Sequence, residues 1–133
     1  MGRRVSRTTR QERALRITRL QSAIAELESH KNFFSRQGEL APEGAWVARY
    51  QVKQPKKVYW YYKLQADKPT FPKTPPVESL SKYKHLGKAG SQDHIDSVMA
   101  VVRRTIVSEL QKTIDSLKSS LIDVSFDGEQ EDI

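Results

Sequence analysis

Tyrosine and cationic side chains alternate along residues 46–65 in a pattern that suits the binding of a polyanion. Lysine and arginine hold phosphate groups, and a tyrosine ring can stack on a base or donate its hydroxyl to a phosphate oxygen. Strand alternation predicts that one surface of a hairpin carries Arg49, Lys53, Tyr59, Tyr61 and Lys63. Lys56 and Lys57 would lie at its tip. We expect this surface to bind nucleic acid, and the alternative is an ordinary solvated sheet face.

Further lysines follow in the chain. Lys82 and Lys84 would extend the basic surface if residues 82–86 form a third strand, and Lys88 comes next within Gly87-Lys88-Ala89-Gly90-Ser91. Backbone N–H groups at such a helix start can hold an anion. The simpler interpretation, which we favour, is a turn followed by an N-cap at Ser91. The spacing does not match a P-loop.

A second basic feature is an arginine series near the start of the chain. At steps of three it contains Arg4, Arg7, Arg10, Arg13, Arg16 and Arg19, with Arg3 beside the first. We expect a flexible basic arm over residues 1–8 that leads into a basic helix, a common device for finding phosphates. The candidate contacts are Arg3, Arg4, Arg7 and Arg10. A solubilising helix face is the alternative.

The chain has few residues that could support catalysis. It contains no cysteine, and His30, His85 and His94 share no metal-ligand spacing. We also find no Ser, His and Asp set that suggests a triad. The sequence therefore predicts a protein that is not an enzyme, with no catalytic residue, metal site or cofactor.

Charge is unevenly distributed within a net charge of +7. Residues 1–19 and 49–88 are strongly basic, whereas residues 125–133 contain only acidic charges and are expected to form a disordered tail. Clustered positive charge is the electrostatic footprint of a nucleic-acid binder. DNA is the expected partner, with RNA as a weaker candidate. The alternative is an interaction module whose basic sheet docks on an acidic protein.

Two long helices are predicted to frame the basic hairpin. The first runs from Thr9 to about Gln37, with an apolar series made of Ile17, Leu20, Ile24, Leu27 and Phe34. The second follows Ser91, with one apolar face made of Ile95, Met99, Val102, Ile106, Leu110, Ile114, Leu117, Leu121 and Val124. If these stripes extend past the sheet, a second copy of the chain would cover them, which predicts a homodimer.

Between the helices, a period of two predicts strands over residues 46–53 and 58–65, joined by a turn at 54–57. A short third strand is expected at 82–86, after a proline-rich connection over 67–79. Trp46 and Trp60 are expected to face the helices. The predicted fold is α+β, with two long amphipathic helices packed on a small antiparallel sheet of two or three strands. It forms a single domain over residues 9–124 in the order α-β-β-β-α.

Three segments resemble a known type of DNA-binding domain. They are Trp46-Val47-Ala48-Arg49-Tyr50, Val58-Tyr59-Trp60-Tyr61-Tyr62-Lys63-Leu64 and Lys82-Tyr83-Lys84-His85-Leu86-Gly87. Residues 46–87 thus resemble the arm-type domains of phage-type integrases, and also small bacterial and plasmid proteins with a similar tyrosine-rich hairpin. The resemblance implies a three-stranded sheet that enters DNA with a helix packed behind it, and it implies no recombinase activity.

Location follows from simpler features. No apolar run approaches the ~20 residues that span a bilayer, and the Arg-rich start has no apolar core typical of a secretory signal. The absence of cysteine is compatible with a reducing compartment. We expect a cytoplasmic protein that does not contact membranes.

Overall fold

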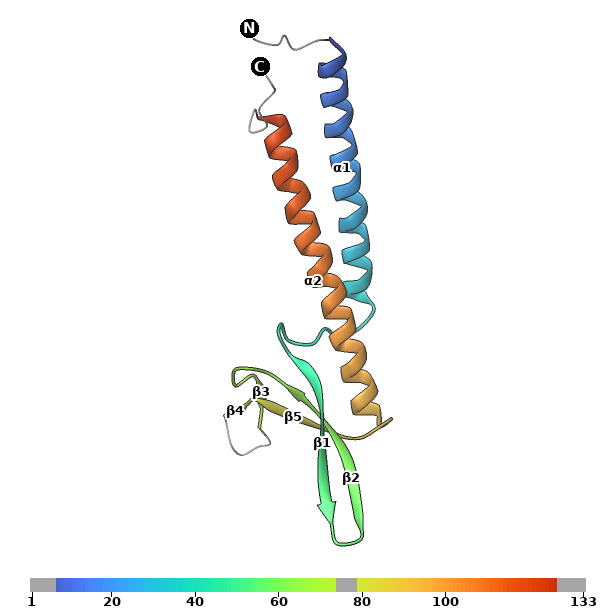
Figure 1. Ribbon diagram of the computed structural model, residues 1–133, viewed down its shortest axis with the longest axis vertical. Helices are drawn as coiled ribbons and strands as arrows, with labels where there is room; N and C mark the ends of the chain where they lie inside the picture. The colour runs from blue at the N-terminus through green and yellow to red at the C-terminus, as the bar shows by residue number, and fades with distance from the viewer. Residues whose placement is uncertain (1–6, 74–78, 127–133) are drawn as a thin grey trace. The chain divides into compact units, whose positions relative to one another are not determined.

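The computed structural model describes residues 7–73 and 79–126 and has an α+β fold (Figure 1). Its elements are α1 (Arg7–Arg36), β1 (Trp46–Gln54), β2 (Lys57–Gln65), β3 (Phe71–Pro72), β4 (Leu80–Ser81), β5 (Tyr83–Lys88) and α2 (Gln92–Ser125). The predicted fold class is confirmed. The short strand β3 lies in the region predicted as an extended connection, 67–79, and pairs with β4, which follows that region. Residues 1–6 of the predicted arm and 127–133 of the predicted tail lie outside the described residues.

The chain forms two compact units. One contains α1 up to Phe34 and the part of α2 that starts at Val107. The other runs from Ser35 to Ile106 and contains all the strands and the first part of α2. We call these the helical unit and the sheet unit.

In the helical unit, the two helices run antiparallel. Arg13 donates from Nε to the carbonyl oxygen of Val124 over 2.9 Å, near one end of the pair. Near the other end, Lys31 donates to the side chain of Gln111. The order of these contacts along the two helices is reversed, as an antiparallel pair requires. Arg13 also places a cation at the C-terminal end of α2, where the helix dipole favours positive charge.

The apolar series predicted for α1 faces the interior of the helical unit. Ile24 is buried, and Ile17, Leu20, Leu27 and Phe34 are half-buried. On α2, Ile114 and Val124 are buried. Steps of three and four keep such residues on one side of a helix, so the predicted α1 stripe and the second half of the α2 stripe are confirmed.

The hairpin of β1 and β2 has a two-residue loop, because Gln54 pairs with Lys57. Residues that pair directly across antiparallel strands have side chains on the same face. Trp46 pairs with Gln65, and Trp60 pairs with Gln51. The two tryptophans therefore lie on opposite faces of the sheet and are 39% and 41% exposed. The prediction that both face the helices is wrong.

The third strand, β5, pairs with β2 on the side away from β1 (Figure 1). The pairing confirms the predicted three-stranded sheet. The register shifts at one point, where Tyr62 pairs with Gly87 but Lys63 pairs with His85, so Leu86 is an extra residue. Gly87 has φ of 85°, a left-handed conformation that favours glycine at a bulge. The bulge changes which side chains of β5 reach each face.

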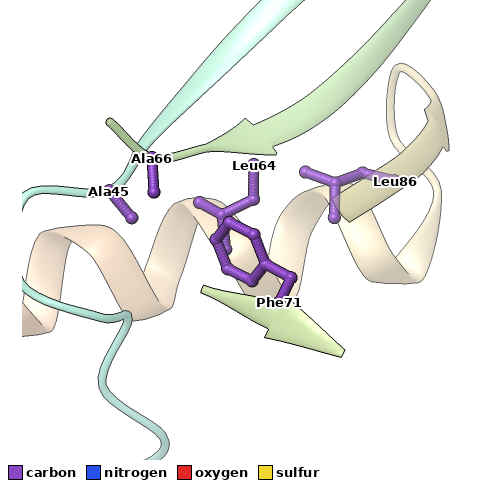
Figure 2. Close-up of a cluster of buried hydrophobic side chains, with 5 residues drawn as sticks. All are labelled: Ala45, Leu64, Ala66, Phe71 and Leu86. Atoms are coloured by element: carbon purple, nitrogen blue, oxygen red, sulfur yellow. The ribbon is translucent and has the colours of Figure 1, made fainter. Parts of the chain in front are cut away.

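One face of the sheet packs against α2 through the buried Leu64 and Leu86 and the half-buried Val47 and Tyr62, and its other residues are exposed. We call it the inner face; it carries Val47, Arg49, Gln51, Lys53, Val58, Trp60, Tyr62, Leu64, Lys84 and Leu86. Its core is the cluster in Figure 2, made of Ala45, Leu64, Ala66, Phe71 and Leu86. Val101 of α2 packs against this cluster. Burial of these apolar side chains holds the sheet and the start of α2 together.

The start of α2 uses a different side from the one predicted. Ser97 and Ala100 are buried, whereas Ile95, Met99 and Val102 are 46%, 48% and 47% exposed. The backbone of the preceding loop comes close to the helix on this side. Ala41 donates its N–H to the carbonyl oxygen of Ala100 over 3.1 Å. The prediction of one continuous apolar face is therefore wrong for the first part of α2.

The helix start is capped as the sequence predicted. Ser91 Oγ accepts a hydrogen bond from the N–H of His94 over 3.3 Å, the geometry of an N-cap. The His94 ring returns to accept from the N–H of Gly90 over 3.0 Å and stacks on Tyr62 with ring centroids 4.0 Å apart. The N–H groups of Gly90 and His94 therefore already have partners, which removes two donors that an anion at this helix start would need.

The buried core of the sheet unit generates a stability prediction. Leu86 is 2% exposed, so Leu86→Ala should lower the free energy of unfolding by about 2–5 kcal/mol. Val58→Ala, at a position 52% exposed on the same face, should lower it by less than about 1 kcal/mol. Urea denaturation followed by circular dichroism measures both. Equal losses would contradict the assignment of the core.

Candidate nucleic-acid interface

The face of the sheet opposite the core carries most of the tyrosines. Register places Tyr50 and Val52 of β1 on this side, with Tyr59, Tyr61 and Lys63 of β2. From β5 it adds Tyr83, His85 and Lys88, which pair with Gln65, Lys63 and Tyr61. We call this the outer face; its aromatic and cationic members are Trp46, Tyr50, Lys57, Tyr59, Tyr61, Lys63, Tyr83, His85 and Lys88.

The rings on the outer face form a connected row across the three strands. The centroid of Tyr61 lies 6.4 Å from that of Tyr59 and 6.0 Å from that of Tyr50. Tyr50 continues the row to His85, with ring centroids 6.0 Å apart and a hydrogen bond of 3.1 Å between its hydroxyl and Nδ1. Such centroid distances are typical of aromatic pairs that interact favourably. The row therefore has a defined arrangement.

Two lysines lie against this row. Lys63 Nζ is 4.4 Å from the ring centroid of Tyr83 and 5.4 Å from that of Tyr50. Lys88 Nζ is 5.1 Å from the ring centroid of Tyr59, at the far end of the row. These distances fall within the range of cation–π attraction, ~6 Å. The bulge at Gly87 has a direct consequence here, because it brings both His85 and Lys88 to the outer face.

The outer face is open and carries no acidic side chain among its strand residues. None of its residues is buried, whereas Leu64 and Leu86 on the inner face are 5% and 2% exposed. Within the described part of the chain, neither Lys63 nor Lys88 forms an ion pair with a carboxylate. The positive charge of this face is therefore available to an anion in solution.

The structure does not bring all the predicted site residues to one face. Arg49 and Lys53 pair with Tyr62 and Val58 and lie on the inner face. The Arg49 guanidinium sits over the Trp60 ring, 4.0 Å from its centroid. The prediction that Arg49 and Lys53 share a surface with Tyr59, Tyr61 and Lys63 is wrong. The two-residue loop pairs Gln54 with Lys57, and this register places odd residues of β1 on the same face as even residues of β2.

Lys84 also lies on the inner face, opposite Leu64. It lines a pocket of about 470 Å³ together with Glu39, Asp93 and Asp96. A phosphate group there would meet three carboxylates, so this pocket does not suit a polyanion.

The remaining predicted cations are spread over other elements. Lys56 lies in the hairpin loop, and Lys57 begins β2 on the outer-face side; both are exposed. Lys82 lies in the bend between β4 and β5 and is exposed. Arg7 is the first residue of α1, and Arg10 is exposed in its first turns. Arg3 and Arg4 lie outside the described residues.

Sequence reasoning missed four aromatic residues of the outer face: Trp46, Tyr50, Tyr83 and His85. With Trp46 and Trp60 both expected to face the helices, strand alternation places Trp46 and Tyr50 on the side opposite Tyr59 and Tyr61. The predicted turn at 54–57 contains the signal that was needed: it pairs residue 54 with residue 57, so even positions of the first strand share a face with odd positions of the second. Tyr83 and His85 follow from the pairing of β5.

Among residues 7–73 and 79–126, no three His, Asp or Glu side chains gather as metal ligands. Over the same residues, neither helix contains a stretch apolar enough to cross a lipid bilayer.

The chain was compared with protein-family models, with curated proteins and with solved structures, and none of the three comparisons gave a match. The similarity to integrase arm-type domains therefore remains a prediction from residues 46–87. The outer face is a site assigned on geometry and charge alone.

Proposed function

We propose that this protein is a non-enzymatic nucleic-acid-binding protein that uses the outer face of its sheet. The observation that carries the proposal is the row of tyrosines with a lysine against each end. Aromatic rings offer contacts to bases and riboses, and lysines offer contacts to phosphates. The outer face thus combines rings that can contact bases with cations that can contact phosphates.

Electrostatics support the same proposal. Residues 49–88 contain ten lysines and arginines against Asp67 and Glu78. Lys56 and Lys57 add positive charge at the hairpin loop, near Tyr59 at one end of the row. Since attraction to phosphates acts over a Debye length of ~8 Å at physiological salt, these lysines would guide a strand toward the rings.

The N-terminal arginines belong to the proposal as a second contact. Arg3, Arg4, Arg7 and Arg10 would bind phosphates without reading bases, as basic arms do. DNA is the proposed partner, with RNA as the weaker candidate, and a cytoplasmic location goes with it. The rival proposal, docking of the basic sheet on an acidic protein, predicts binding that survives nuclease treatment.

We also propose that the chain pairs with a second copy through α2. Ile95, Met99 and Val102 are spaced i, i+4 and i+7 and are each nearly half exposed. Such spacing forms one apolar stripe on a helix, and a symmetric dimer can bury the same stripe of both copies. A dimer would also double the number of sheets that contact one nucleic acid.

The first prediction of this proposal concerns salt. The affinity for a nucleic acid should fall with salt, with a slope of about −0.9 per neutralised phosphate on a duplex and about −0.7 on a single strand. Replacing the two lysines that contact the tyrosine row, Lys63→Gln with Lys88→Gln, should make the slope shallower by about 1.4–1.8. Fluorescence anisotropy of a labelled oligonucleotide at several salt concentrations measures this.

Lys84→Gln is the control, since it removes one lysine from the inner face of β5, the strand that also carries Lys88. It should leave the slope nearly unchanged. A flat slope for the unmodified protein, or no binding at low salt, would reject nucleic acid as the partner and favour the acidic-protein alternative.

The dimer generates a separate prediction. Met99→Glu puts a charge in the middle of the exposed stripe and should convert a dimer into a monomer, because a buried unpaired charge is costly. Analytical ultracentrifugation measures the mass. Thr105→Glu, at an exposed position outside the stripe, should leave the dimer intact. A monomeric unmodified protein at high concentration would refute pairing through α2.

A further inference from the structure

The chemistry of the outer face distinguishes between two forms of nucleic acid. Reading a duplex in the major groove relies on side chains that form bidentate hydrogen bonds to base edges, above all arginine, asparagine and glutamine. Stacking on aromatic rings requires bases that have left the duplex, which single strands supply. The composition of the face therefore indicates which form it fits.

The groups that read base edges are scarce on the outer face. The arginine of the β1–β2 hairpin, Arg49, is on the inner face with its guanidinium over Trp60. Among the outer-face residues of β1 and β2, amides lie at the two ends of the hairpin: Gln65 pairs with Trp46 far from the loop, and Gln54 pairs with Lys57 at the loop. The remaining polar groups are lysines, His85 and the tyrosine hydroxyls.

The groups that stack are, in contrast, abundant and adjacent. Tyr59, Tyr61 and Tyr50 follow one another at 6.4 Å and 6.0 Å, and each ring is half-buried rather than enclosed. Tyr50 is oriented by its hydrogen bond to His85, so part of the row is held in place before any ligand binds. Rings that are already ordered lose little side-chain entropy on binding.

The lysines lie where the phosphates of a strand along this row would run. Lys88 contacts the Tyr59 ring, and Lys63 contacts the rings of Tyr50 and Tyr83, so a cation lies at each end of the row. A backbone that follows the rings would meet positive charge at both ends. An aromatic row bordered by cations is the arrangement that sequence-tolerant single-strand binding uses.

We infer that the outer face binds a single-stranded nucleic acid, with bases stacked on Tyr50, Tyr59 and Tyr61 and phosphates held by Lys63 and Lys88. The inference rests on the proposed function and narrows it from nucleic acids in general to single strands. It applies to DNA and RNA strands alike, because both present the same bases and phosphates to the rings.

The test measures the affinity of the full-length protein for three labelled oligonucleotides of about 15 nucleotides, a length near the upper end of single-domain site sizes. The probes are a DNA single strand, an RNA single strand and a DNA duplex of the same sequence. We expect at least one of the single strands to bind more tightly than the duplex at the same salt concentration. The comparison of the first two probes identifies the preferred sugar.

Variants on the two faces of β2 make the test specific. Tyr61→Leu removes a ring from the row and should weaken single-strand binding about 5- to 150-fold, since stacking contributes ~1–3 kcal/mol per base. Tyr61→Phe keeps the ring and should bind nearly as well. Trp60→Leu is the matched control, because it removes a 41% exposed ring on the inner face, one residue away.

The outcomes separate the inference from the proposed function. A duplex that binds as tightly as both single strands, with Tyr61→Leu neutral, would overturn the single-strand inference and leave nucleic-acid binding in place. Absence of binding to all three probes at low salt would overturn both. If Trp60→Leu weakens binding as much as Tyr61→Leu while both variants keep the melting temperature, the outer face is not the site.

Discussion

The pairing of Gln54 with Lys57 across a two-residue loop is the constraint on which the sheet depends. Side chains alternate along a strand, so a shift of one residue would move every side chain of β1 to the other face. With this loop, Tyr50 joins Tyr59, Tyr61 and Lys63. Arg49 instead joins Trp60, where its guanidinium lies over the indole. The composition of both faces therefore follows from the length of one turn.

A second local feature completes the outer face. The bulge at Gly87 places an extra residue, Leu86, in β5, where it is buried in the core. Residues before and after the bulge then point to the same side, so His85 and Lys88 both reach the tyrosines. Gly87 can adopt the required positive φ at little cost, whereas a side chain there would be strained. The bulge at Gly87 thus both places Leu86 in the core and brings His85 and Lys88 to the outer face.

The helix α2 buries a different side in each of the two units. From Val107 onward, its buried side chains follow the predicted stripe and belong to the helical unit. In its first part, the side with Ser97 and Ala100 is buried instead, and a loop backbone hydrogen-bonds to Ala100 there. Ile95, Met99 and Val102 are left exposed as a result. A helix that packs differently in two units uses a different side in each.

The helices and strands of this protein follow from local sequence patterns. The spacing of Ile17, Leu20 and Ile24 predicted α1, the alternation around Tyr59 and Trp60 predicted the hairpin, and Ser91 predicted the start of α2; each of these is local and depends on periodicity or capping. Tertiary structure decided which face each strand residue occupies and which side of α2 is buried. Strand pairing, the bulge at Gly87 and the close approach of the loop to Ala100 are relations between distant segments, and periodicity within one segment does not encode them. For that reason the sequence identified Tyr59, Tyr61 and Lys63 as a group, and only the fold added Trp46, Tyr50, Tyr83 and His85 and removed Arg49, Lys53 and Lys84.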